Sequence, residues 1–247
     1  MDETPLRIDR RPDRVVAALH RPEKRNAIDL ETVEALHALC DEVESDPRTL
    51  ILTGSDGIFA AGADIAQLRA RRADDARRGI NASVFLRIRE LPMPVIAALD
   101  GPALGGGAEL AYAADIRLAT PRLRLGHPET ALGIMAAAGA TWRLREIAGE
   151  AVASDLLLTG RIVDGDEALR LGLVAALHSP DELLPAAHAI TDRIAANDPL
   201  ATRHTKTALR APRTAHPEID GELQAELFES AEKMRRMTEF LERRGRR

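Results

Sequence analysis

Hydrophobic and polar residues alternate near the start of the chain, as they do in strands that bury one face. Over residues 7–21 this alternation predicts two strands around a turn at residues 11–13. After Asp29, apolar residues recur at helical spacing, so Asp29 is expected to cap a helix. A short apolar run over residues 49–53, which ends at Gly54, predicts a buried strand.

The middle of the chain alternates between helical patterns and short apolar runs. Asp64 is expected to cap a helix, and a long helix is predicted over residues 73–89, because prolines at 92 and 94 stop the pattern. Three consecutive glycines precede a helix predicted over 108–114. Further strands are expected at 95–99, 116–119, 123–125, 162–164 and 173–177, and further helices at 141–147, 154–158 and 165–171.

Strand patterns end at Ser179, and the rest of the chain is helical in pattern. The alternation before that point predicts an α/β core over residues 1–178, followed by a C-terminal helical region over 179–247. The last helices carry apolar stripes that include Leu223, Leu227, Met234, Met237 and Phe240. Such stripes fit subunit contacts, and they fit packing against the same chain equally well.

Composition narrows the class of protein. The formal net charge is −5 and aromatic residues make up only 2% of the 247 residues, so nucleic acid is not expected as a partner. Cys40 is the only cysteine, and the seven histidines show no ligand spacing, so no disulfide and no metal site are expected. Neither a signal peptide nor a membrane span is evident, which predicts a cytoplasmic protein with no membrane partner.

Two small-residue turns carry candidate chemistry. The segments 59–65 (FAAGADI) and 103–110 (ALGGGAEL) each read as a strand end followed by a helix start. Backbone N–H groups at a helix start lack intrahelical partners, and small residues let a ligand approach them closely. The two turns can therefore offer amides to one oxyanion, although each taken alone is equally a tight turn with close packing.

Two glutamates accompany these turns. Glu109 follows the three glycines, and Glu129 lies in the segment 125–129 (LGHPE). Each alone reads as a surface charge near a helix start, but together they indicate a pair of carboxylates at one pocket. His127 is interpreted as a loop residue that shapes this pocket. A dinucleotide fingerprint, a serine-hydrolase elbow and a phosphate loop are all missing from the sequence.

These segments resemble the enoyl-CoA hydratase/isomerase (crotonase) family. The resemblance runs from residues 20–28 (HRPEKRNAI) to the tail at 240–244 (FLERR), and the paired motifs at 59–65 and 103–110 are specific in combination. It implies a spiral of ββα units with a C-terminal helical trimerisation region. It also implies a homotrimer or a dimer of trimers that acts on an acyl-CoA thioester and needs no separate cofactor, since coenzyme A is part of the substrate.

The resemblance also implies roles for individual residues. Ala63 and Gly106 match the positions whose amides form the oxyanion hole, and Glu109 and Glu129 match the two glutamates that hold and activate water. Glu129 is expected to be the more indispensable acid/base. The residues matching the coenzyme A and substrate contacts are Lys24, Arg25, Asn26, Ala61, Ala63, Asp64, Ile65, Ala66, Gly105 and Gly106.

The reaction implied is the addition of water to a trans-2-enoyl-CoA, which gives a 3-hydroxyacyl-CoA. The alternatives are enoyl-CoA isomerisation, decarboxylation or thioester hydrolysis on the same scaffold, and a catalytically idle acyl-CoA-binding protein. Two glutamates favour hydration, because isomerisation can use a single base. The chain departs from the family pattern at 136–140 (AAAGA), where Ala137 replaces a usual glycine.

Overall fold

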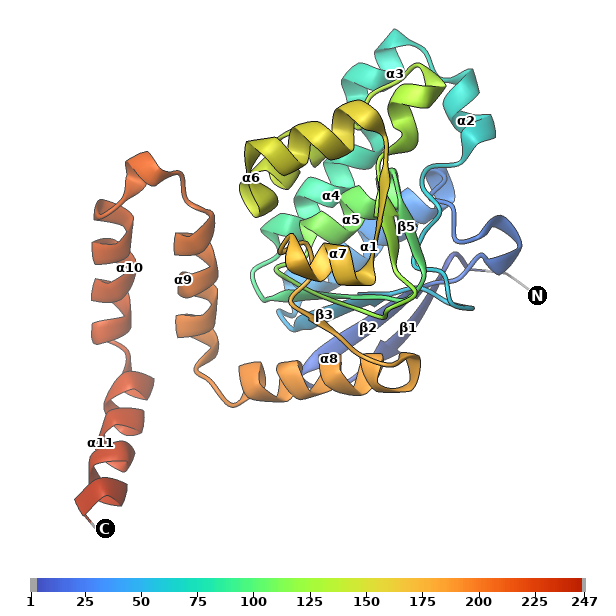
Figure 1. Cartoon of the computed structure of the whole chain (residues 1–247). Coiled ribbons are helices and arrows are strands. Elements are labelled where there is room, and N and C mark those ends of the chain that lie inside the picture. Colours follow the sequence, from blue (N-terminus) through green and yellow to red (C-terminus); the bar gives the residue numbers. More distant parts are fainter. Residues whose placement is uncertain (1–3, 246–247) are drawn as a thin grey trace. The chain divides into compact units, whose positions relative to one another are not determined.

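The core of the protein is a six-stranded sheet, seen here in a computed structural model that describes residues 4–245 (Figure 1). The first two strands are antiparallel, and every later neighbour pairs in parallel. Parallel strands buried on both faces read as continuous apolar runs, and β3 and β4 are buried at every residue. In spatial order the strands are β1 (Leu6–Arg10), β2 (Arg14–Leu19), β3 (Thr49–Thr53), β4 (Val95–Leu99), β6 (Ile116–Ala119) and β9 (Ala176–Leu177).

A second, three-stranded sheet stands beside the first. Its strands are β5 (Pro102–Leu104), β7 (Arg124–Gly126) and β8 (Ile162–Asp164), in that order. Strand β5 follows β4 directly in the chain and pairs in parallel with β7. The small sheet therefore begins at the end of a central strand of the large one.

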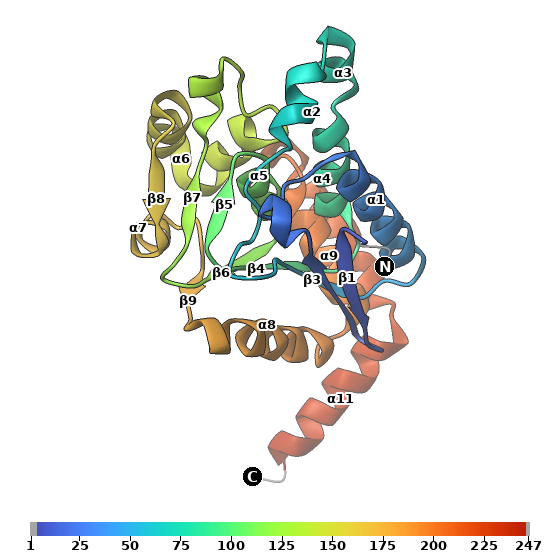
Figure 2. The same cartoon turned by 90° about the vertical axis from the view of Figure 1, so that its right-hand side faces the viewer.

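Helices cover both faces of the large sheet. Figures 1 and 2 show α1, α4 and α5 over one face and α8 along the other, where Arg14 Nη1 donates to the His188 carbonyl at 3.1 Å. Their bounds, in chain order, are α1 (Leu30–Ser45), α2 (Ile65–Ala70), α3 (Ala73–Arg78), α4 (Ile80–Glu90), α5 (Gly106–Ala113), α6 (Ala140–Thr159), α7 (Gly165–Arg170) and α8 (Pro180–Ala195).

The N-terminal caps expected from the sequence are confirmed. Asp29 accepts from the Thr32 N–H at 2.9 Å and begins α1, whose buried stripe includes Val33, Leu36 and Val43. Asp64 accepts from the Gln67 N–H at 2.9 Å and begins α2. A short polar side chain that accepts a free N–H fixes where each helix starts.

The long helix predicted over residues 73–89 is wrong. The chain instead forms α3 and α4, separated by Gly79, whose φ of 61° lies in the left-handed region. Glycine adopts this region at little cost, so it ends α3 and starts α4 in a new direction. The break matters because both short helices border the main cavity described below.

Several other boundaries differ from the predictions. Helix α5 begins at Gly106, two residues before the predicted start, and β9 is limited to Ala176–Leu177 within the predicted strand 173–177. Strand β5 was not expected, because three residues carry too little pattern. The two helices predicted within 141–158 join into α6, which is interrupted at Gly149 by a non-helical backbone.

The chain divides into two compact units, one ending at Thr191 and the other starting at Asp192. The second unit contains α9 (Pro199–Arg210), α10 (Glu218–Phe228) and α11 (Ala231–Gly245), and no strand lies within residues 192–245. Within it, His204 Nε2 lies 2.9 Å from Glu226 Oε2, which joins α9 to α10. Among the described residues, no helix has the length and apolarity needed to cross a membrane.

Candidate functional site

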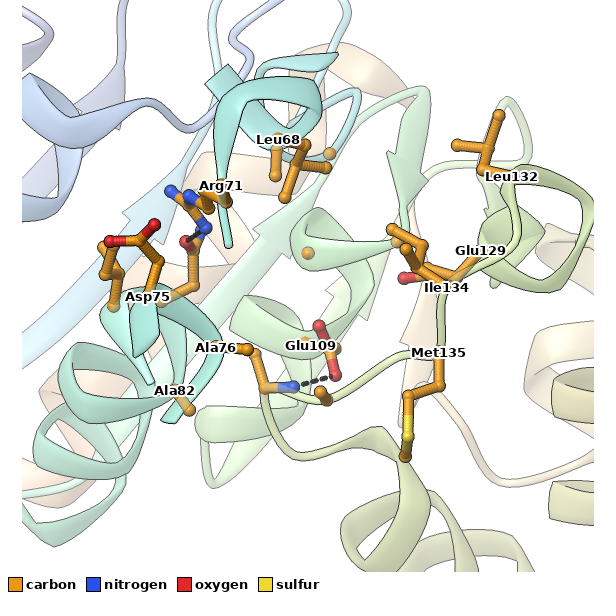
Figure 3. A pocket seen from close by; sticks show the side chains of 18 of the residues that line it. Leu68, Arg71, Asp75, Ala76, Ala82, Glu109, Glu129, Leu132, Ile134 and Met135 are labelled. Atoms are coloured by element: carbon orange, nitrogen blue, oxygen red, sulfur yellow. Dashed lines mark hydrogen bonds between the residues drawn. The ribbon is translucent and has the colours of Figure 1, made fainter. Parts of the chain in front are cut away.

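A cavity of about 660 Å³ opens between the short helices α2 to α4 and the segment after β7 (Figure 3). Its floor is the start of α5, and its far wall is the segment that follows the short 3₁₀ helix Pro128–Leu132. Both predicted glutamates and both predicted amide positions line it. The structure therefore brings together residues that lie on three separate segments of the sequence.

The two small-residue turns lie side by side. A parallel bridge joins Ala60 to Ala103, with the Leu104 N–H donating to the Ala60 carbonyl at 3.0 Å. A methyl group placed on Gly106 would lie 3.5 Å from the Ala63 nitrogen. Within the described residues, neither the Ala63 N–H nor the Gly106 N–H donates to a backbone or side-chain acceptor. Two unused donors therefore lie close together on the cavity wall, and stabilising an oxyanion requires neighbouring donors of this kind.

Glu109 is buried beneath this point, with 5% of its surface exposed. Its Oε1 accepts from the Ala138 N–H at 2.7 Å and from the Ala140 N–H at 3.1 Å, so the carboxylate is held in one orientation (Figure 3). Burial raises the pKa of Glu109 to about 7, although the two amides oppose this shift. A carboxyl with that pKa can give or take a proton near neutral pH.

Glu129 faces the same cavity from the opposite wall (Figure 3). Its Oε2 is buried and has no hydrogen-bond partner among the residues that the structure describes, and His127 Nδ1 lies 3.7 Å away. A methyl group on Gly105 would lie 2.9 Å from Glu129 Oε1, and the φ of Gly105 is +50°. Gly105 therefore makes room for the carboxylate, which is a requirement that the sequence pattern did not reveal.

His127 is fully buried behind Glu129. Its Nε2 lies 3.3 Å from the Tyr112 hydroxyl, and the two rings are 5.6 Å apart between centroids. Burial raises the pKa of Tyr112 well above its usual range, so the phenol stays neutral. The imidazole borders a second cavity of about 360 Å³ under α6 and not the main one.

The residues matched to coenzyme A and substrate contacts separate into two groups. Ala61, Ala63, Ile65, Gly105 and Gly106 line the main cavity. The remaining matched residues, Lys24, Arg25, Asn26, Asp64 and Ala66, are not part of its lining.

The local contacts of this second group explain their positions. Arg25 adjoins the cavity through its carbonyl, which accepts from the Ala61 N–H at 3.1 Å. Asn26 is buried and donates to the Ile58 and Ser55 carbonyls at 2.7 and 3.2 Å, so its side chain fixes the loop. Asp64 serves as the cap of α2.

Sequence reasoning missed much of the cavity wall. The apolar side chains of Leu132, Ile134 and Met135 line it although all three are exposed. Arg71 and Asn81 also line it, joined by a hydrogen bond of 3.0 Å from Nη1 to Oδ1. No periodic pattern marks such residues, because their position at the cavity depends on how separate segments of the chain fold together. Within residues 4–245, no group of three potential metal ligands is present.

Comparison with known proteins identifies the scaffold. The chain matches the enoyl-CoA hydratase/isomerase family model over residues 15–246. It is 37% identical over 240 residues to the short-chain-enoyl-CoA hydratase of Clostridium acetobutylicum, covering 93% of this chain and 91% of that protein. It is 38% identical to the crotonyl-CoA hydratase of Syntrophomonas wolfei, covering 93% of this chain and 92% of the relative.

A solved structure agrees with these sequence relatives. The enoyl-CoA hydratase from Bacillus anthracis superimposes with a TM-score of 0.91 at 30% identity, covering 97% of this chain and 96% of that one. The predicted α/β architecture with a C-terminal helical region is thereby confirmed. The family match, the relatives and the fold agree, and this chain belongs to the enoyl-CoA hydratase/isomerase family.

Proposed function

We propose that this protein is an enoyl-CoA hydratase that adds water to the double bond of a trans-2-enoyl-CoA, giving a 3-hydroxyacyl-CoA. The observation that carries the proposal is the pair of carboxylates, Glu109 and Glu129, that face one cavity beside the unused amides of Ala63 and Gly106. The family match and the two hydratase relatives support it.

The thioester carbonyl is proposed to bind with its oxygen at the Ala63 and Gly106 N–H groups. When water adds at Cβ, negative charge grows on this oxygen, and donors that are already in place stabilise it. A single donor of this kind is typically worth about 10²–10³ in rate. The N-terminus of α5 adds positive potential at the same point.

The two glutamates are proposed to share one water molecule. The amides of Ala138 and Ala140 fix one oxygen of Glu109, which leaves its other oxygen for the water. The buried Oε2 of Glu129, which has no partner within the described part of the chain, is proposed as the second acceptor. One carboxylate takes a proton from the water as the other delivers a proton to Cα, and Glu129 is proposed as the more indispensable of the two.

The proposal also covers the cofactor, the oligomeric state and the location of the enzyme. The substrate brings its own coenzyme A, so no separate cofactor is needed. A homotrimer or a dimer of trimers in the cytoplasm is proposed from the family resemblance. Hydration is preferred to isomerisation because two carboxylates, not one, reach the cavity.

The test uses crotonyl-CoA and the variants Glu109→Gln and Glu129→Gln. The wild-type protein is expected to remove the ultraviolet absorbance of the conjugated thioester and to give a product heavier by one water. Each variant is expected to lower the rate by about 10²–10⁴, the usual contribution of a positioned acid or base. Glu31→Gln, an exposed change in the first turn of α1, is the matched control.

Any of three results contradicts the proposal. A product of unchanged mass identifies isomerisation, and near-wild-type turnover in both glutamine variants removes the glutamates from the reaction. The absence of turnover with any 2-enoyl-CoA identifies a binding protein without catalysis.

A further inference from the structure

The main cavity has a polar corner that the proposed reaction does not use. Arg71 follows the last turn of α2, and Asn81 lies in the first turn of α4. Both line the cavity, and Arg71 Nη1 donates to Asn81 Oδ1 at 3.0 Å (Figure 3). Gly79 ends α3 and turns the chain into α4 at this point. A continuous helix over residues 73–89 would not form this corner.

The corner contains hydrogen-bond donors that find no acceptor within residues 4–245. Asn81 is 93% buried, since 7% of its surface is exposed, yet its Nδ2 has no hydrogen-bond partner in this part of the chain. Within the described residues, no carboxylate oxygen comes within 4.0 Å of the Arg71 guanidinium. Leaving a buried amide N–H₂ without a partner is unfavourable, and a ligand that supplies an acceptor would remove that cost.

The charges of the corner favour an anion. Arg71 and Arg72 line the cavity together with three acids, of which Glu109 and Glu129 belong to the proposed reaction and Asp75 lies on α3. Asp75 Oδ2 is occupied by the Arg72 N–H at 2.9 Å, and Oδ1 lies 4.0 Å from Arg78 Nη1. A guanidinium has five donors in a planar fork that matches a carboxylate, and among the described residues Arg71 uses one of its five, in the bond to Asn81.

The corner lies on the acyl side of the proposed reaction. Glu109 also borders a small cavity lined by Ala82, Phe85 and Leu86, so the α4 wall directly adjoins this glutamate. The glutamates act at Cα and Cβ, and groups that extend past them toward α4 are the remainder of the acyl chain. The cavity wall on the side of α2 and α4 is largely apolar and includes Leu68, Ile80 and Ala82, which suits the methylene groups of an acyl chain.

We propose that Arg71 and Asn81 bind a carboxylate at the far end of the acyl chain, so that the preferred substrates are 2-enoyl-CoA monothioesters of dicarboxylic acids. This inference rests on the proposed hydratase function and adds the substrate class. One carboxylate oxygen takes the free donors of Arg71, and the other takes the Asn81 N–H₂. The apolar wall holds the carbons between this anchor and the double bond.

The test measures kcat/KM for pairs of 2-enoyl-CoA substrates of equal chain length, one ending in a carboxylate and one in a methyl group. The readout is kcat/KM for the carboxylate substrate divided by kcat/KM for its methyl counterpart. The fraction of folded enzyme affects both values equally and so cancels from this ratio. At the chain length that reaches the corner, wild-type protein is expected to favour the carboxylate. Arg71→Met is expected to lower the ratio by roughly 10–100-fold, the usual loss for a hydrogen bond to a charged group.

Further variants make the test specific. Asn81→Asp places a carboxylate beside Arg71 and is expected to abolish the preference, because the guanidinium is then paired. Asp75→Asn removes a like charge and is expected to raise the ratio. Arg69→Met is the matched control, because Arg69 lies in the last turn of α2, two residues before Arg71, but does not line the cavity.

The outcomes separate this inference from the hydratase proposal. Crotonyl-CoA turnover by the wild-type protein keeps the hydratase proposal regardless of the ratio. A wild-type ratio of one or less at every chain length overturns the carboxylate site. An equal rise of KM for both members of a pair in Arg71→Met also overturns it, and assigns Arg71 to the phosphates of coenzyme A.

Discussion

At the scale of single residues, burial and two amides act in opposite directions on Glu109. Removal from water disfavours the charged carboxylate, whereas the Ala138 and Ala140 N–H groups favour it. Burial is the larger effect, and the pKa of Glu109 is raised from 4.5 to about 7. The folded protein therefore binds a proton at pH values where the unfolded chain has already released it.

This difference predicts a pH-dependent stability. The contribution of protonated Glu109 is fully present below pH 4.5 and is lost as pH rises to about 7. A shift of this size corresponds to about 3 kcal/mol in the free energy of unfolding. Glu109→Gln has no such proton, so the stability of wild type relative to this variant is expected to fall between pH 5 and pH 8, by roughly that amount. Urea unfolding across that range measures it, and a constant difference would contradict the raised pKa.

Gly105 predicts a second effect at this scale. A methyl group there would lie 2.9 Å from Glu129 Oε1, and the backbone is at φ +50°. Gly105→Ala is expected to displace the carboxylate and to lower kcat/KM by about 10²-fold, as small misplacements of catalytic groups do. It is also expected to cost about 1–2 kcal/mol of stability from backbone strain.

The control for this effect is Gly172→Ala. Gly172 has φ +72° and nothing within 4 Å of an added methyl group, so it shares the positive φ without the collision. Steady-state kinetics and urea unfolding of both variants separate the displacement of the Glu129 carboxylate from the cost of backbone strain. Equal activity in the two variants would show that Gly105 serves only the backbone.

The candidate site was only partly predictable from the sequence. Glu109 and Glu129 could be found because each follows a short motif, and the structure brings both to one cavity. Arg71 and Asn81 could not, because their contact depends on the turn at Gly79 and on the burial of one amide nitrogen. The need for glycine at position 105 comes from its contact with Glu129, more than twenty residues away, and no local sequence pattern reveals it.

At the scale of elements, predictions held where the cause is local. Strands β3, β4 and β6 have the predicted bounds, because runs of apolar residues end at clear breaks. The helix predicted over 73–89 failed because a single glycine in the left-handed region outweighs continuous helical periodicity. Strand β5 is held by the bridge from Ala103 to Ala60 and by its pairing with β7, both of which are non-local.

At the scale of the whole molecule, the parallel sheet explains how the site is assembled. Strands β3 and β4 are neighbours that run in the same direction, so the segments that follow them leave the sheet at the same edge. One segment carries Ala63 and the other carries Gly106, and the bridge at Ala60 keeps them adjacent. Residues more than forty positions apart thereby share one cavity, as the carboxyl ends of parallel strands commonly do in α/β proteins.

The C-terminal unit predicts how copies of the chain associate. Along α11, Met234, Met237 and Leu241 recur at helical spacing, and all three are more than half exposed, as is Phe240 beside them. The opposite face holds an ion-paired row in which Arg235 contacts Glu232 and Glu239. Exposing an apolar stripe of this kind to water is unfavourable. Such a stripe, opposite a charged face, is typical of a surface that packs against another protein surface.

If this stripe is the contact between subunits, the proposed trimer depends on it. Met237→Asp places a charge within the contact and is expected to shift the protein from three or six chain masses toward one, measured by light scattering after size exclusion. Arg235→Gln changes the net charge by the same amount on the opposite face, so it is expected to leave the mass unchanged. A wild-type protein of one chain mass contradicts the proposed assembly, and an unchanged mass in Met237→Asp places the contact elsewhere. The unfolding of α11 alone would lower helical circular dichroism in Met237→Asp, which distinguishes a broken contact from a broken helix.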